Sequence, residues 1–336
     1  MGFVRSKSRT PDVDPGLQVI QRVYKAMNVD QKWSIGEERG FVWWGKDFAQ
    51  HLWAEPGFDD SGFMVYRVHA RCDLLKQFVP SAENLKKLNA LSTLASLSGF
   101  ARDGRSPDRI QLATSMYVHS KTVEWVTRLF GFAVAIQAAQ AQIQGSLVAD
   151  LVGAEPDISP HPLAGFRREA DDMLNVIPDL VVPTGEGKSK WGKTDFNVVL
   201  QAFTEQGFMC SGGDGLGLTA EFPFLSFTSL FQAVIDEPHP QLGNGLLLRL
   251  TLPSKPDGDP YERVLYLNEL ELKSLTLSHM LGSWCVGSLG VTFVAFFPNA
   301  THDLNFINVA LSMVLRARWV VARVFASGCG TRPGVL

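Results

Sequence analysis

The segment from Gly187 to Thr194 reads GKSKWGKT, which satisfies the phosphate-binding loop pattern G-x-x-x-x-G-K-[ST]. In such a loop consecutive backbone N–H groups surround the phosphates, the lysine reaches the β- and γ-phosphates, and the hydroxyl residue binds Mg²⁺. Gly187, Gly192, Lys193 and Thr194 would occupy these positions. Residues 233–237, AVIDE, read like the apolar strand that ends in a Mg²⁺-binding acid. This interpretation predicts a nucleotide-binding protein.

The surrounding sequence argues against a working phosphate loop. The inner residues 188–191, KSKW, are bulky or charged and include no glycine, the residue whose positive φ lets a backbone approach a phosphate. The only candidate for a preceding strand, Leu180–Val182, is short and ends at Pro183. The chain that follows has the pattern of antiparallel hairpins, whereas the loop requires βαβ units. We therefore interpret GKSKWGKT as part of a linker and keep nucleotide binding as the alternative.

Other candidate sites also have simpler structural explanations. The glycine-rich residues 211–218, SGGDGLGL, precede a strand pattern rather than a helix, which predicts a turn and no dinucleotide site. Asp59–Asp60 falls in a predicted turn, and Asp171–Asp172 falls on a predicted solvated helix face. Neither pair is expected to act as an acid and base. Glu269 and Glu271 share a predicted helix with Lys273, which indicates an exposed charged face.

The cysteines and histidines predict no metal site. The four cysteines are scattered, without C-x-x-C and without a metal-ligand spacing to a histidine. Cys72 and Cys285 lie in apolar runs and are expected to be buried, inert thiols, whereas Cys329 lies in a Gly-rich tail and is expected to be exposed. His279 follows a leucine pattern, so we predict a core or interface histidine. We expect no catalytic residues, no metal and no cofactor.

The chain contains a faint internal repeat. Residues 48–75 and 230–253 both read as an apolar strand, then Glu-Pro, then turn residues, then an alternating apolar strand. Period-two alternation between turn residues predicts a β-hairpin in each copy. Glu55–Pro56 and Glu237–Pro238 are then the equivalent hairpin turns, which explains AVIDE without a Mg²⁺ site.

Helical patterns flank both hairpins. Leucine and other apolar residues recur at helical spacing before, between and after the strand patterns, and Ser81 is placed to cap one helix. The predicted helices are GLQVIQRVYKAMN, SAENLKKLNALSTLASLSGF, residues 123–151, TDFNVVLQAFTEQGF with a cap at Thr194 or Asp195, YERVLYLNELELKSLTLSHMLGSW and residues 304–325. A short helix, FRREADDMLNV, is predicted in the linker. Each half therefore reads α-β-β-β-α-β-β-α, an α+β pattern with antiparallel sheets.

The order of these elements, with YLNELELKSLTLSHMLGSW, LGVTFVAFF and NFINVALSMVLRARWVV in the second half and KLNALSTLASLSGF in the first, resembles the type III secretion chaperone-like fold. More narrowly, it is similar to the YbjN-like group of bacterial proteins with that fold. The resemblance implies binding of a protein or an extended peptide, and no catalysis. Proteins of that fold are often homodimers, so two tandem copies would form a pseudo-dimer within one chain. The family's secretion members are short and strongly acidic, whereas this chain is long and nearly neutral.

The expected organisation is a first chaperone-like copy over residues 14–152, a partly packed linker over 153–193 and a second copy over 194–327. Residues 1–13 and 328–336 are expected to be flexible tails. The 336 residues carry 31 basic and 34 acidic side chains, a net charge of −3, so we expect neither nucleic acid nor a membrane surface as partner. Without a signal-peptide core or an apolar run long enough to span a bilayer, the chain is expected to be cytoplasmic.

The candidate binding surface consists of tryptophans in or near predicted strands. These are Trp43, Trp44, Trp53 and Trp284. Consecutive residues of a strand point to opposite faces, so Trp43 and Trp44 cannot both enter the same core. We expect at least one of them to be exposed or to be buried at an interface. The alternative is that all four are ordinary core residues.

Overall fold

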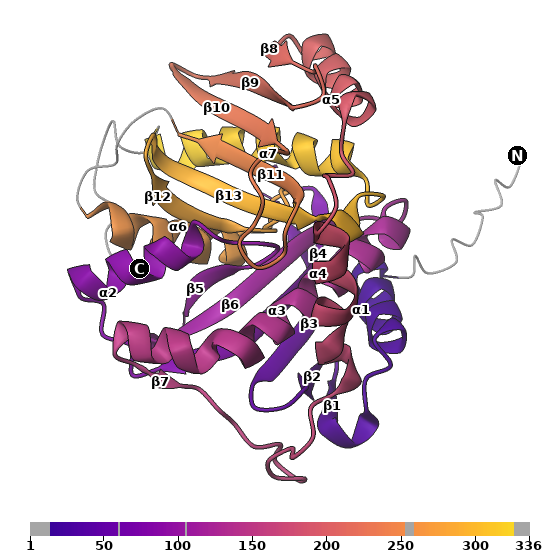
Figure 1. Cartoon of the computed structure of the whole chain (residues 1–336), viewed down its shortest axis with the longest axis vertical. Helices are drawn as coiled ribbons and strands as arrows, with labels where there is room; N and C mark the ends of the chain where they lie inside the picture. The colour runs from indigo at the N-terminus through magenta and orange to yellow at the C-terminus, as the bar shows by residue number, and fades with distance from the viewer. Residues whose placement is uncertain (1–13, 60, 105, 253–258, 326–336) are drawn as a thin grey trace, which may run out of the picture.

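The computed structural model describes residues 14–59, 61–104, 106–252 and 259–325 (Figure 1). This part of the chain has α+β architecture, with seven α-helices and two antiparallel sheets. In Figure 1 the second sheet lies above the first. None of the helices in these ranges is both long enough and apolar enough to cross a bilayer.

The first sheet has the strand order β1-β2-β3-β4-β6-β5, and a short seventh strand, β7, pairs with β4. Its strands are β1 (Ser34–Glu37), β2 (Gly40–Trp44), β3 (Ala49–Phe58), β4 (Met64–Lys76), β5 (Gly99–Asp103), β6 (Ser106–Val118) and β7 (Glu155–Pro156). The long central strands alternate apolar and polar side chains, so one face of the sheet is apolar and the other is rich in charged residues.

The second sheet has the strand order β8-β9-β10-β11-β13-β12. Its strands are β8 (Met209–Gly212), β9 (Gly217–Phe224), β10 (Phe227–Val234), β11 (Gly245–Thr251), β12 (Ser283–Gly287) and β13 (Gly290–Pro298). The glycine-rich segment of residues 211–218 forms the β8–β9 turn, as predicted. Gly212, Gly213 and Gly215 have positive φ there, a conformation that L side chains rarely adopt.

Helices cover one face of each sheet. The helices are α1 (Pro15–Ala26), α2 (Ala82–Ser92), α3 (Val123–Val152), α4 (Val182–Gly185), α5 (Lys193–Glu205), α6 (Pro260–Lys273) and α7 (Phe306–Val320). Helices α1 and α3 pack on the first sheet, and α5 and α7 pack on the second, where Phe203 of α5 contacts Phe222 and Phe231. Helices α2 and α6 lie side by side where the two sheets meet (Figure 1).

The order of elements departs from the prediction by one strand in each half. Residues 15–152 run α-β-β-β-β-α-β-β-α up to the end of α3, and residues 193–320 do the same. The predicted order had three strands in the first run, where the structure has four. The short strands β1 and β8 read SIGE and MCSG, and such four-residue, glycine-containing segments carry no recognisable alternation.

The Glu-Pro pairs are not equivalent turns. Glu55 and Pro56 lie inside β3, where Pro56 pairs with Tyr66 of β4. The turn of this hairpin follows β3, where the backbone N–H of Asp59 donates to the carbonyl of Phe63. Glu237–Pro238, in contrast, lies in the connection between β10 and β11. The expectation of a shared turn is therefore wrong for the first pair.

Three predicted helices are shorter than expected. Helix α2 ends at Ser92, and the last residues of the predicted segment SAENLKKLNALSTLASLSGF already belong to β5. Helix α6 ends at Lys273, and residues 274–282 form an extended connection to β12 instead of further helical turns. The linker segment FRREADDMLNV contains only the 3₁₀ turn Asp172–Asn175. Long helices are recovered closely, since α3 spans Val123–Val152 and α7 continues into a π-helical turn at Val321–Phe325.

Candidate functional site

The connection between α6 and β12, residues 274–282, crosses from the second half of the chain to the first sheet. Arg67 of β4 donates from Nη1 to the carbonyl oxygens of Thr276 (2.7 Å) and Ser278 (3.1 Å), and to the Thr276 hydroxyl (2.9 Å). The Arg67 side chain is fully buried. A buried connection must satisfy its backbone carbonyls, and here a charged side chain of the first half does so.

Backbone hydrogen bonds cross the junction between the halves in both directions. The N–H of Ser115 in β6 donates to the carbonyl of Met280 in the α6–β12 connection (3.1 Å). The N–H of Phe296 in β13 donates to the carbonyl of Ala95 in the α2–β5 connection (3.2 Å), and the Ser96 hydroxyl donates back to Phe296 (3.0 Å). Each sheet is therefore extended, beyond the end of its short edge strand, by a connection from the other half.

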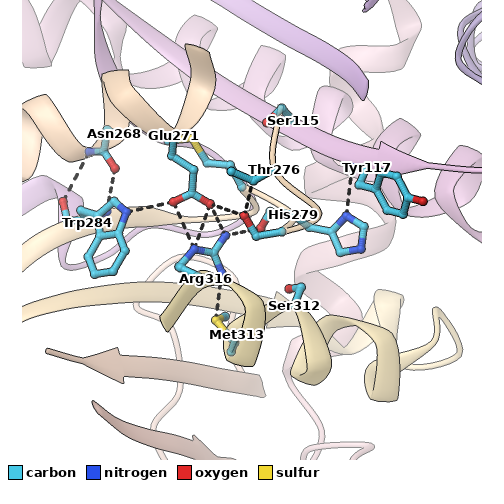
Figure 2. A network of polar contacts seen from close by, with 12 residues as sticks. Ser115, Tyr117, Asn268, Glu271, Thr276, His279, Trp284, Ser312, Met313 and Arg316 are labelled. Carbon is cyan, nitrogen blue, oxygen red and sulfur yellow. Dashed lines mark hydrogen bonds and ion pairs between the residues drawn. The ribbon is translucent and has the colours of Figure 1, made fainter. Parts of the chain in front are cut away.

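A buried ion pair lies beneath this connection (Figure 2). Glu271 of α6 accepts from the Nη2 (2.7 Å) and Nε (2.9 Å) atoms of Arg316 in α7 through its Oε1. Its Oε2 accepts from the indole N–H of Trp284 (2.9 Å), and Oε1 also accepts from the Ser278 hydroxyl (3.1 Å). Both charged side chains are fully buried. Burial alone would raise the pKa of Glu271, but the Arg316 charge and these hydrogen bonds outweigh it and lower the pKa.

The junction holds two buried arginines and one buried carboxylate, and its histidine is neutral. Burial, with the charges of Arg67 and Arg316, lowers the pKa of His279 to about 3. The His279 Nδ1 atom accepts the backbone N–H of Tyr117 (3.2 Å), so the ring connects the α6–β12 connection to β6 (Figure 2). His279 is thus a buried interface histidine, as predicted.

Two asparagines bind the free edge of β12. Asn268 of α6 accepts the N–H of Trp284 (2.7 Å), and its Nδ2 atom donates to the Phe100 carbonyl of β5 (2.9 Å). Asn89 of α2 accepts the N–H of Val286 (2.7 Å) and donates to the Val286 carbonyl (3.3 Å). Each asparagine directly follows a leucine, in the segments KLNALSTLASLSGF and YLNELELKSLTLSHMLGSW of the two halves. They occupy the hydrogen-bonding groups that an edge strand otherwise leaves open.

A groove of about 510 Å³ lies on the outer side of the α6–β12 connection. Its walls come from both halves, namely the end of the β3–β4 hairpin, the residues from Lys273 to Leu277, and the last turns of α7 with the π turn that follows. Large apolar side chains line it, including Phe58, which is 64% exposed, and Leu315, which is 37% exposed. Among the described residues, its charged lining consists of Lys273, Arg318, Arg323 and Asp59.

A larger hollow of about 1060 Å³ lies between the end of α1 and the linker. Its lining is mostly polar and mixes acidic with basic residues. Arg167 there is bound to Asp171 (2.9 Å) and lies near Asp30 (3.8 Å). Because these charges are paired within the hollow, it presents no single electrostatic character.

Three of the four predicted surface tryptophans are buried. Trp43 donates its indole N–H to Asp171 (3.3 Å), Trp44 donates to the Ser159 hydroxyl (3.3 Å), and Trp284 donates to Glu271. Trp43 and Trp44 do point to opposite faces of β2, but the linker covers the second face. Trp53 alone is partly exposed, stacked on His69 with the ring centroids 4.8 Å apart. The four side chains do not form a common surface.

The segment GKSKWGKT forms the entry to α5. Residues Leu180–Val182, the candidate strand before it, lie in helical turns, so the strand expected for a phosphate loop is absent from this part of the described chain. Side chains of the protein accept hydrogen bonds from three N–H groups of the loop, those of Lys190, Trp191 and Gly192. The N–H of Lys190 donates to the Asn299 side chain (2.9 Å), and the N–H of Gly192 donates to Asp195 (2.9 Å). Helix α5 begins at Lys193 with Gly192 as its N-cap, so Thr194 and Asp195, the two predicted cap positions, lie inside its first turn.

Two sequence expectations about carboxylates, those for Glu271 and Asp171, are wrong. Glu271 is fully buried rather than on an exposed face, whereas Glu269 forms the expected i,i+4 pair with Lys273. Asp171 is also buried, because it accepts hydrogen bonds from Trp43 and Arg167. The signal for Glu271 was present in the sequence, since the buried stripe of α6 comprises Val264, Leu267, Asn268, Glu271 and Leu272 at helical spacing.

The cysteine expectations are confirmed where the structure describes them. Cys72 and Cys285 are buried, and burial raises the pKa of both thiols, that of Cys285 to about 12. Both are therefore protonated at neutral pH and poor nucleophiles. Cys329 lies outside the described residues, as do both predicted tails. Within the described ranges, no group of three or more His, Cys, Asp or Glu side chains is placed to hold a metal ion.

A repeated P-H-P-x-x-G string marks a feature that the sequence analysis missed. It occurs at residues 160–165 and 238–243. In both copies the histidine and the glycine exchange backbone hydrogen bonds, and the histidine Nδ1 atom accepts two further N–H groups. His239 also binds the Leu94 carbonyl through Nε2 (3.0 Å). These are histidine-closed turns that stabilise two connections, and nothing in them indicates chemistry.

Comparison with protein-family models, with curated proteins and with solved structures finds no match to this chain.

Proposed function

We propose that the chain is a tandem duplication whose two copies form a pseudo-dimer, and that it acts as a non-catalytic module that binds a protein or an extended peptide. Both the pseudo-dimer and the binding role are what the resemblance to the type III secretion chaperone-like fold, and to its YbjN-like group, implies. A cytoplasmic location belongs to the same proposal.

The duplication is supported by strand order and by the junction. Both sheets follow one order, in which the last strand of each half lies between the fourth strand and a short edge strand. Aligning the ladders makes Ser115 of β6 equivalent to Phe296 of β13, because Gly99–Ala113 and Ser283–Val294 are corresponding pairs. These equivalent residues each donate their N–H to the other half. Such reciprocity is what a two-fold interface requires.

The binding role is supported by one observation, the groove of about 510 Å³ whose walls come from both halves. Grooves of this size with large apolar side chains at the rim suit a short polypeptide segment. In contrast, Glu271 and Arg316 of the buried network beneath it bind each other and neighbouring groups of the chain. Nucleotide binding through Lys193 is not proposed, since the N–H groups of Lys190 and Gly192 in that loop are bound to protein side chains.

The test is site-specific photo-crosslinking in cells. A photoreactive amino acid replaces Leu315 in the groove, and a matched variant carries it at Val198 of α5, which is 52% exposed and away from the groove. We expect ultraviolet light to yield a crosslinked polypeptide from position 315 and none from position 198. Equal or absent crosslinking at the two positions would contradict the proposed function.

A further inference from the structure

We propose that the turn closed by His239 is an acid-sensitive latch between the two halves. It holds residues 93–98 of the first half against the second sheet and releases them when His239 takes up a proton. The turn lies in the connection between β10 and β11 and is one of the two P-H-P-x-x-G turns. This inference concerns the junction alone, so it does not depend on what the groove binds.

Both ring nitrogens of His239 are engaged, each in a fixed role. The Nδ1 atom accepts the backbone N–H groups of Gln241 (3.1 Å) and Leu242 (3.2 Å), so it carries no proton. The Nε2 atom lies 3.0 Å from the carbonyl oxygen of Leu94, which can only accept, so Nε2 carries the proton and donates it. The folded turn therefore requires the neutral ring in one tautomer.

The latch joins the halves because Leu94 belongs to the α2–β5 connection of the first half. In the same connection the Ala95 carbonyl accepts the N–H of Phe296 in β13 (3.2 Å), and the Ser96 hydroxyl donates to the Phe296 carbonyl (3.0 Å). The Phe296 ring also packs against the His239 ring, with the centroids 5.0 Å apart. Residues 94–96 are thus held by the second half, and the His239 turn is one of the groups that hold them.

The turn also closes over an apolar cavity of the first half. Gln241 accepts a hydrogen bond from Gln144 of α3 (2.6 Å), and both side chains belong to residues that line a cavity of about 60 Å³. Leu94 lines the same cavity, and its apolar wall includes the buried residues Phe100 and Leu112. Movement of the turn and of residues 93–98 would expose this wall.

A proton on His239 is incompatible with the turn. The imidazolium ring carries N–H on both nitrogens, so Nδ1 would direct a donor at the N–H groups of Gln241 and Leu242. Burial lowers the pKa of His239, and the hydrogen bond to Leu94 offsets this only in part. The folded turn therefore binds a proton less readily than the unfolded chain does. Its stability is complete above the ordinary pKa of 6.5 and is lost as the pH falls.

The charged side chains around the turn do not compensate a proton on the ring. The first-half and β13 segments that contact the turn contain no charged residue; they are residues 93–98, 133–149 and Gly290–Pro298. In the β10–β11 connection, Asp236 is exposed and Glu237 is bound to Arg249 of β11 (2.8 Å). Glu186, in the linker beside this connection, is exposed. Proton uptake therefore acts through the hydrogen bonds of the turn.

The experiment is amide hydrogen exchange of the full chain, resolved by NMR, between about pH 7.5 and pH 5. We expect the protection factors of Gln241, Leu242 and Phe296 to fall at least about tenfold over this range, relative to that of Leu248 within β11. His239→Gln should abolish this pH dependence, because glutamine does not titrate.

The repeated turn supplies the matched control. His161→Gln removes the histidine of the other P-H-P-x-x-G turn, whose Nε2 atom has no hydrogen-bond partner within the described ranges, and should leave the pH dependence as in the wild type. In the wild type, the nitrogen chemical shifts of the His239 ring should show proton uptake at the pH where protection is lost.

Three results would overturn the proposal. The first is protection that stays constant down to pH 5, and the second is a pH dependence that persists in His239→Gln. The third is loss of protection at Leu248 together with the turn, which indicates global unfolding rather than a latch. If His239→Gln does not fold, ring protonation at a pH different from that of amide exposure overturns the proposal instead.

Discussion

Asn89 and Asn268 lie on two neighbouring helices and bind alternate peptide units of one edge strand, β12. Asn268 binds the N–H of Trp284 and Asn89 binds the N–H of Val286, each at 2.7 Å. Residues two apart in a strand direct their backbone groups to the same side. The two amide side chains therefore take the place of a further strand, and they join α2 of one half to a sheet of the other.

Replacing these asparagines by alanine should destabilise the protein unequally. Asn89→Ala leaves one N–H and one carbonyl of Val286 without a partner, which costs about 1–3 kcal/mol of unfolding free energy. Asn268→Ala should cost more, because Asn268 is more deeply buried and also binds Phe100. Urea denaturation measures both. The control Asn84→Ala, on the exposed side of α2, should change stability by less than about 1 kcal/mol. Equal losses in all three variants would contradict the assignment.

Removing one partner of the Glu271–Arg316 pair should greatly lower the free energy of unfolding. Glu271→Gln removes the buried negative charge that Arg316 binds, and breaking a buried pair in this way costs about 3–5 kcal/mol. Glu269→Gln, in the same helix, breaks a surface i,i+4 pair and should cost about 0.5 kcal/mol or less. Chemical denaturation of both variants at neutral pH compares them. Similar losses would show that the burial of Glu271 is energetically unimportant.

As the pH is lowered, the free energy of unfolding should begin to fall near the ordinary pKa of histidine, before the carboxylates titrate. The folded-state pKa of His279, about 3, lies below its ordinary value of 6.5, so between these values the unfolded chain binds a proton that the folded chain does not. This contribution to stability is complete above pH 6.5 and is lost as pH falls, by about 1.4 kcal/mol per pH unit. His279→Gln should flatten the slope of unfolding free energy between pH 6.5 and 4.5. An unchanged slope would contradict a buried neutral ring.

Nucleotides should not bind at GKSKWGKT. Isothermal titration of the intact chain with ATP or GTP in the presence of Mg²⁺ should release no heat of binding, and Lys193→Ala should behave identically. The physical reason is that Asn299 and Asp195 already occupy loop N–H groups. Micromolar binding that Lys193→Ala abolishes would overturn this account and restore the phosphate loop.

Local sequence signals predicted the regular parts of the fold well. The cap of α2 is one example, because the Ser81 hydroxyl accepts the N–H of Asn84 as its position before the leucine pattern indicated. The long apolar helices α3 and α7 and the central hairpin strands were also predicted, since each carries many turns or alternations of a consistent pattern. These features depend on residues that are close together in the chain.

The junction could not be predicted in this way, because distant residues determine it. Residues 274–282 contain leucines at spacings that continue the helix, yet Arg67, more than two hundred positions earlier, binds their carbonyls and favours an extended chain. The alignment of residues 48–75 with 230–253 that the sequence suggests also differs by one residue from the equivalence that the structure shows. The ladders pair Gln232 with Arg249 and His51 with Arg71, which makes Glu55 equivalent to Asp236 rather than to Glu237. This equivalence follows from the strand register of the folded chain and not from the sequence.

If the two halves form one unit through their junction, as we propose, they should stay together when the chain between them is cut. A protease site inserted at Leu163, which is 91% exposed in the linker, allows the chain to be cut between the halves after folding. Size-exclusion chromatography with light scattering then measures the mass of the cut protein, for the wild type and for Arg67→Met. We predict that the wild-type fragments stay together at the intact mass of 37.0 kDa, whereas Arg67→Met weakens their association. Separation of the wild-type fragments into independent halves would contradict the claim.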